Sequence, residues 1–136
     1  MDQVYTLEQT DQVAVQLVQK YAMHPVWVFQ APMGAGKTTL IAAIGRALGI
    51  QQAMSSPTFS IMNEYEVQGK LIYHMDWYRL ESEAEARQAG VEAAMEEADL
   101  SLVEWPEKAP NLVPEQAVVF NIEFIDPNQR RIYTNQ

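Results

Sequence analysis

The chain of 136 residues contains no cysteine, so it has neither a disulfide framework nor a thiolate metal site. That composition suits a reducing compartment. Its apolar runs are far shorter than the roughly 20 residues that a membrane-spanning helix needs. The opening residues, MDQVYTLEQTDQ, lack a basic segment followed by an apolar one, so we predict no signal peptide. These absences favour a cytoplasmic protein that does not associate with membranes.

Basic side chains are also scarce. Nine lysines and arginines stand against 18 aspartates and glutamates, and the formal net charge is −9. A protein that binds nucleic acid mainly through phosphates needs a basic face. We therefore expect any nucleic acid in the pathway to be held mainly by another protein, and a partner with a basic surface is the easier match.

The residues that are present suffice for one folded unit. Apolar side chains make up 48% of the chain, and no repeat, low-complexity tract or linker interrupts it. A chain of this length forms one domain with a proper core but not two. We predict a single domain over residues 1–136.

Apolar periodicity predicts strands and helices in alternation. Helices are expected at 10–22, at 38–44 with a stop at Gly49, and at 81–98, where Gly90 divides the segment in two. Strands are expected at 26–29, 59–67, 70–75, 100–103, 118–125 and, as a last edge strand, 131–133. Gln68-Gly69 fits a tight hairpin turn. The pattern predicts an α/β sandwich with a mixed parallel and antiparallel sheet.

The strongest motif is APMGAGKT, residues 31–38, which matches G-x-x-x-x-G-K-[ST] except that Ala31 replaces the first glycine. Small residues let backbone N–H groups curl around phosphate oxygens, and the following helix adds the positive end of its dipole. Lys37 suits the β- and γ-phosphates, and the Thr38 hydroxyl suits Mg²⁺. The Ala31 methyl is tolerable if φ is negative there. The motif predicts a P-loop NTPase-like three-layer sandwich.

Two carboxylates follow apolar strands: Asp76 ends the segment from Ile72, and Glu104 ends the segment from Leu100. A nucleotide site of this kind needs an acid at the end of a neighbouring strand to hold the metal's water shell. Both residues are candidates for direct metal contact. His74, a lone histidine within a strand, is typical of a packed or surface residue and receives no role.

Hydroxyls and a proline lie between the loop and the hairpin, at residues 55–59. Such a segment resembles a switch that senses the γ-phosphate, with Ser56 and Thr58 as the candidate residues. The same residue types are typical of an ordinary turn. Taken alone, the segment favours the turn.

Four segments occur in the order seen in the TsaE (YjeE) family and resemble its motifs: APMGAGKTTL at 31–40, SPTFSIMNEY at 56–65, HMDWYRL at 74–80 and EWPE at 104–107. The resemblance extends to about Pro106. It implies a small bacterial ATPase of tRNA threonylcarbamoyladenosine (t6A) synthesis that uses ATP and Mg²⁺. It further implies two protein partners, TsaB and TsaD, which hold the tRNA, so this chain meets tRNA only indirectly. Hydrolysis is then expected to be slow until the partners dock.

The resemblance also implies roles for single residues. Lys37 binds phosphate, Thr38 and Glu104 hold Mg²⁺, and Asp76 orients the attacking water, which makes Asp76 and Lys37 the catalytic candidates. The expected nucleotide ligands are Met33, Gly34, Ala35, Gly36, Lys37, Thr38, Thr39 and Trp105. The chain departs from the family pattern at Ala31, at Pro32, where an acid is common, and at Trp77, where leucine is frequent. Pro32 removes a charge and an N–H, so these departures bear on nucleotide affinity.

Two other functions compete with this interpretation. A small-molecule P-loop kinase needs an arginine-bearing lid, but Arg87 is the only base in the acidic segment 81–99. Arg79 is still close enough in sequence to the Asp76 motif to reach the phosphates. The other alternative is a nucleotide-dependent binding module without turnover, in which Asp76 and Glu104 only hold metal.

Overall fold

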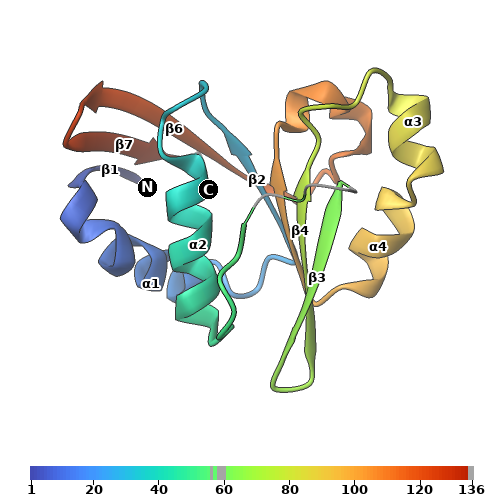
Figure 1. Ribbon diagram of the computed structural model, residues 1–136, viewed down its shortest axis with the longest axis horizontal. Helices are drawn as coiled ribbons and strands as arrows, with labels where there is room; N and C mark the ends of the chain where they lie inside the picture. The colour runs from blue at the N-terminus through green and yellow to red at the C-terminus, as the bar shows by residue number, and fades with distance from the viewer. Residues whose placement is uncertain (56, 58–60, 135–136) are drawn as a thin grey trace.

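The computed structural model describes residues 1–55, 57 and 61–134 (Figure 1). Its strands are β1 (Asp2–Thr6), β2 (Val26–Gln30), β3 (Met62–Val67), β4 (Lys70–Asp76), β5 (Leu100–Glu104), β6 (Val118–Asp126) and β7 (Gln129–Tyr133). Its α-helices are α1 (Thr10–Lys20), α2 (Lys37–Leu48), α3 (Glu83–Gln88) and α4 (Val91–Glu97). Short 3₁₀ helices lie at Leu7–Gln9, Pro106–Lys108 and Pro110–Leu112. Within the described residues, no helix is long and apolar enough to span a membrane.

All seven strands form one sheet in the order β1-β7-β6-β2-β5-β4-β3. The central strand β2 runs parallel to both β5 and β6, and β4 runs parallel to β5. The pairs β1–β7, β6–β7 and β3–β4 are antiparallel. The predicted mixed α/β sheet is confirmed. Because parallel strands end at one edge of a sheet, the residues after β2, β4 and β5 lie close together.

Helices cover both faces of this sheet (Figure 1). Strand β2 is buried on both sides, as expected of a central parallel strand. Its Trp27 and Phe29 belong to the core under α1 and α2, whereas Val26 and Val28 belong to the core that contains residues of α3 and α4. This period of two confirms the predicted three-layer arrangement.

The C-terminal strand differs from its expected position. We expected 131–133 at the edge of the sheet, but β7 lies between β6 and β1, and β1 is the edge strand. Strand β1 was not predicted from the sequence, because Asp2–Thr6 buries only Tyr5 and shows no clear apolar alternation. The apolar signal of an edge strand is weak when few of its side chains reach the core.

The β3–β4 hairpin turn offers a test of local backbone chemistry. Gln68 and Gly69 both have positive φ, 53° and 78°, as a two-residue type I′ turn requires. Asparagine tolerates this conformation better than glutamine, so Gln68→Asn should raise the free energy of unfolding by about 0.5 kcal/mol. Urea denaturation measures the change, and Gln52→Asn, an exposed glutamine outside the left-handed region, serves as the control. An equal effect of both substitutions would contradict the turn assignment.

Candidate functional site

The glycine loop, residues 31–36, joins the carboxyl end of β2 to the first residue of α2. Gly34 and Gly36 have φ of 82° and 86°, and Gly36 is the N-cap of α2. Ala31 is not among the non-glycine residues with positive φ, so its methyl group is accommodated as expected. The Ala35 N–H donates to the Pro32 carbonyl at 3.2 Å, which closes a tight turn. The backbone N–H groups in the first turn of α2 are left without intrahelical partners, as at any helix start.

Lys37 is the unusual residue of this loop. Its side chain is buried, at 7% relative exposure, and within the described part of the chain its Nζ has no hydrogen-bond partner. Burial lowers the pKa of Lys37, and the carboxylates of Glu104, Asp76 and Glu107 oppose that shift. A buried ammonium without an acceptor is uncommon in folded proteins. It fits a site that an anion completes.

Asp76 and Glu104 are neighbours at the ends of two parallel strands. They are register partners in the β4–β5 pair. Glu104 is buried at 2% relative exposure, whereas Asp76 is half-buried. The Asp76 Oδ1 accepts the N–H of Tyr78 at 3.0 Å. The topology thus brings together the two carboxylates that the sequence singled out.

His74 contacts Glu104 directly and was missed by the sequence analysis. It is fully buried, and its Nε2 lies 2.6 Å from Glu104 Oε2. The alternation of side chains along a strand indicates that His74 lies on the same face of the sheet as Asp76, because the two residues are two positions apart on β4. What the pattern alone did not provide was the register that sets β4 beside β5. The contact holds one oxygen of the Glu104 carboxylate in place.

Trp105 covers the ammonium group. Its ring centroid is 3.8 Å from Lys37 Nζ, within the range of a cation–π contact. The Trp105 ring also contacts the Tyr78 ring, with 4.9 Å between the two ring centroids. Trp105 has a left-handed backbone, with φ 58° and ψ 51°, directly before Pro106. Strain of this kind in a non-glycine residue clusters at functional sites.

Lys37, Asp76, Glu104 and Trp105 line one pocket of about 440 Å³. Of the predicted site residues that the structure describes, all line it except Ala35, which is buried at 1% relative exposure. The unpredicted lining residues are Pro32, Tyr78 and Arg130. The switch-like candidates Ser56 and Thr58 lie outside the described residues. Arg130 was missed because the C-terminal segment matches no motif.

The donor set around Thr38 suits a metal ion only together with a phosphate ligand. Within residues 1–55, 57 and 61–134, no group of three or more His, Cys, Asp or Glu side chains is arranged to hold a metal. Mg²⁺ keeps several waters and uses one or two carboxylates plus substrate phosphates. Thr38, Asp76 and Glu104 all line the pocket and fit that chemistry.

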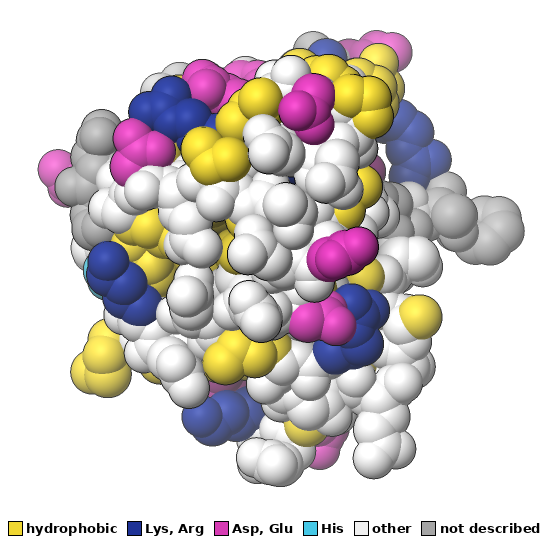
Figure 2. Space-filling view, turned by 90° about the vertical axis from the view of Figure 1, so that its left-hand side faces the viewer, with side chains coloured by type: hydrophobic (Ala, Val, Ile, Leu, Met, Phe, Trp, Pro, Cys, Tyr) yellow, Lys and Arg dark blue, Asp and Glu magenta, His cyan; other side chains and the backbone are white. Residues whose placement is uncertain are grey.

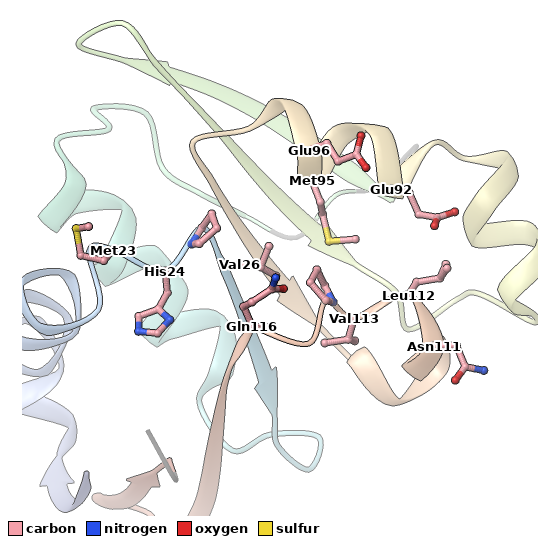
Figure 3. Close-up of a pocket in the computed structure, with 13 residues that line it drawn as sticks. Met23, His24, Val26, Glu92, Met95, Glu96, Asn111, Leu112, Val113 and Gln116 are labelled. Atoms are coloured by element: carbon pink, nitrogen blue, oxygen red, sulfur yellow. The ribbon is translucent and has the colours of Figure 1, made fainter.

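A larger pocket of about 600 Å³ lies at the opposite ends of the strands and contains none of the predicted site residues. It is bordered by α4 and by the segments that precede β2 and β6. Figure 3 shows Val26, Met95 and Val113 around the space between these elements. Among the described residues, its lining includes the carboxylates of Glu92 and Glu96 but no lysine or arginine, whereas the smaller pocket contains Lys37 and the left-handed Trp105, so the smaller pocket is the candidate site.

The fold and the smaller pocket define an α/β protein with a glycine loop, a buried lysine and two strand-end carboxylates at the carboxyl ends of its parallel strands. The family model described as "Threonylcarbamoyl adenosine biosynthesis protein TsaE" matches residues 4–132. The chain belongs to the TsaE family. The resemblance seen in the four sequence motifs is thereby confirmed.

Several relatives carry the description "tRNA threonylcarbamoyladenosine biosynthesis protein TsaE". The protein of Haemophilus influenzae is 37% identical over 94 residues, which are 69% of this chain and 60% of the relative. That of Synechocystis is 41% identical over 111 residues, 78% of this chain and 69% of the relative. A crystal structure of Bacillus subtilis YdiB matches with a TM-score of 0.77 and 24% identity, covering 98% of this chain and 83% of that one. This structural likeness supports the fold.

Proposed function

We propose that this chain binds ATP with Mg²⁺ in the pocket beside the glycine loop and hydrolyses the ATP in support of t6A synthesis. The observation that carries the proposal is the buried Lys37 ammonium, which has no hydrogen-bond acceptor among residues 1–55, 57 and 61–134. It lies at the start of α2, where the helix dipole and the first-turn N–H groups also favour an anion. A polyphosphate supplies the missing acceptor.

Each side chain then has a separate task. Lys37 and the backbone N–H groups of α2 bind phosphate oxygens, and Thr38 and Glu104 hold the metal ion. When bound, Mg²⁺ polarises the phosphoryl oxygens. His74 fixes the Glu104 carboxylate through the 2.6 Å contact. Asp76, the more exposed of the two acids, orients the attacking water.

The acidic charge of the chain supports a role beside protein partners. On the described part of the face in Figure 2, acidic and basic side chains are interspersed and no extended basic area forms. With a net charge of −9, direct capture of tRNA is electrostatically unfavourable. We place the chain in the cytoplasm, acting on a TsaB–TsaD pair that holds the tRNA. Docking of that pair aligns Asp76 and speeds hydrolysis.

ATP hydrolysis by the purified chain, with and without the TsaB–TsaD pair of the same organism, tests the proposal. We expect slow turnover alone and stimulation by the pair. ATP bound without turnover under either condition would favour the nucleotide-dependent binding module. Phosphate transferred to a small acceptor, detected by mass, would favour the kinase. Absence of ATP binding would overturn the proposal.

Trp105 provides an optical readout of the same site. Its ring contacts the Lys37 ammonium, whereas Trp27 and Trp77 are buried in the cores on the two faces of the sheet. ATP that draws the ammonium to phosphate must change the surroundings of the indole. Tryptophan fluorescence should therefore shift on ATP titration, and the shift should fall by about 10-fold or more in Trp105→Phe. Trp27→Phe should retain it, and loss of the signal in that control would contradict the assignment to Trp105.

A further inference from the structure

Arg130 reaches the nucleotide pocket from a part of the chain remote in sequence. It lies on β7, paired with Tyr5 of β1 and Phe124 of β6. Its side chain is buried at 7% relative exposure and lines the same pocket as Lys37 and Thr38. The C-terminal hairpin thus contributes a cation to a site otherwise built from the glycine loop, the start of α2 and the segments that end β4 and β5.

The guanidinium of Arg130 is fixed by three backbone carbonyls. Its Nε donates to the Ala35 carbonyl at 2.9 Å, and Nη1 donates to those of Asp126 at 2.7 Å and Gln129 at 3.0 Å. The planar group is therefore oriented before any ligand arrives. A Cβ added at Gly36 would come within 3.3 Å of Arg130 Nε, so the loop and the arginine are closely packed.

The charge of Arg130 has no anionic partner within the described part of the chain. Its hydrogen bonds go to neutral carbonyls, its Nη2 makes none, and no carboxylate lies within ion-pair distance among those residues. The guanidinium carbon lies 4.7 Å from the centroid of the Phe124 ring, within the range of a cation–π contact. Its neighbour Arg131, by contrast, pairs with Asp2 at 2.7 Å and with Glu123 at 3.0 Å. The three carbonyls and the Phe124 ring offset part of the cost of the largely buried Arg130 charge, and an anion in the pocket is the partner that would balance it.

We propose that Arg130 is a second cationic ligand of the nucleotide polyphosphate. It holds the glycine loop through the Ala35 carbonyl, and its Nη2 donates to a phosphate oxygen. This inference rests on the proposed ATP site. It extends that site to the C-terminal hairpin, in which no motif signals a function.

Calorimetric titration with ATP separates the charge of Arg130 from its structural role. Arg130→Gln should weaken ATP binding by about 10- to 100-fold, because a charge-assisted hydrogen bond is lost. Arg130→Lys, which keeps the charge without the planar fork, should recover at least part of the affinity. Arg131→Gln removes an arginine from the adjacent position but only breaks exposed ion pairs, so its affinity should match that of the wild type. In steady-state hydrolysis, Arg130→Gln should raise KM more than it lowers kcat.

The unfolding temperature of each nucleotide-free variant shows whether Arg130 contacts phosphate or only stabilises the glycine loop. If Arg130→Lys and Arg130→Gln lose the same amount of ATP affinity and have the same unfolding temperature as each other, the charge of Arg130 does not contribute to binding. Arg130 would then only stabilise the glycine loop, and the inference would be overturned. A folded Arg130→Gln that binds ATP as tightly as the wild type would also overturn it, while the proposed function would stand. Failure of the wild type to bind ATP would overturn both.

Discussion

Lys37→Met is expected to weaken ATP binding by about 100-fold or more, and yet to raise the thermal stability of the nucleotide-free protein. The first effect follows from the loss of a charge-assisted contact to phosphate. The second follows from burial, because the Nζ has no hydrogen-bond partner among the described residues and desolvation disfavours the charged form. The methionine fills similar space without a charge. A rise of the unfolding temperature by ~3 °C corresponds to about 1 kcal/mol in a chain of this size.

The pH dependence of stability gives this prediction a defined sign. Burial lowers the pKa of Lys37 below its usual 10.5, so the unfolded chain binds this proton more tightly than the folded one. The penalty is fully present below the folded-state pKa and is lost as pH rises from that pKa towards 10.5. The stability advantage of Lys37→Met should therefore shrink across this window. Burial raises the pKa of Tyr5, but this tyrosine is common to both proteins and cancels in the difference.

Calorimetric ATP binding and thermal unfolding of the nucleotide-free proteins measure the two effects. Lys108→Met is the matched control. Lys108 is an exposed lysine whose Nζ lies 5.4 Å from the centroid of the Tyr78 ring, which in turn contacts Trp105. It should change neither quantity appreciably. A Lys37→Met protein that is less stable than the wild type would show that the ammonium stabilises the fold. ATP binding preserved in Lys37→Met would remove Lys37 from the phosphate site.

Local patterns predicted most of the fold. The buried run at β2, the left-handed Gly49 that ends α2 and the Gln68-Gly69 turn depend on neighbours within a few residues, and all three were predicted. The order of the strands depends on pairings between distant segments. For that reason β1 was missed and β7 was placed wrongly at the edge, since its position is set by pairing with the first residues of the chain.

The candidate site divides in the same way. The glycine loop and the two strand-end carboxylates follow local rules, and the structure brings them into one pocket. His74 required the register of β4 against β5, which only the assembled sheet provides. Arg130 required a contact between residues 95 positions apart. Side chains that serve a site through distant segments leave little periodic or motif signal in a single sequence.

Asp76→Asn is expected to lower partner-stimulated turnover by about 100-fold while leaving ATP affinity nearly unchanged. Asparagine keeps an oxygen that can accept the Tyr78 N–H, the bond that Asp76 Oδ1 makes at 3.0 Å. The backbone N–H at this position also keeps its bond to the Ile61 carbonyl at 2.9 Å. The substitution therefore removes a negative charge with little change to the strand end. Loss of turnover without loss of binding is the signature of a group that orients water in the transition state.

Single-turnover hydrolysis in the presence of the TsaB–TsaD pair, alongside calorimetric ATP binding, separates these quantities. Glu107→Gln is the control, because Glu107 is an exposed acid close enough to influence the Lys37 pKa. It should retain turnover within about 3-fold, as expected for an exposed charge in high dielectric. Equal losses of binding and turnover in Asp76→Asn would assign the residue to metal or nucleotide binding. Undiminished stimulation would mean that Asp76 does not orient the attacking water, and it would leave Glu104, buried at 2% relative exposure and held by His74, as the only other strand-end carboxylate that lines the pocket among the described residues.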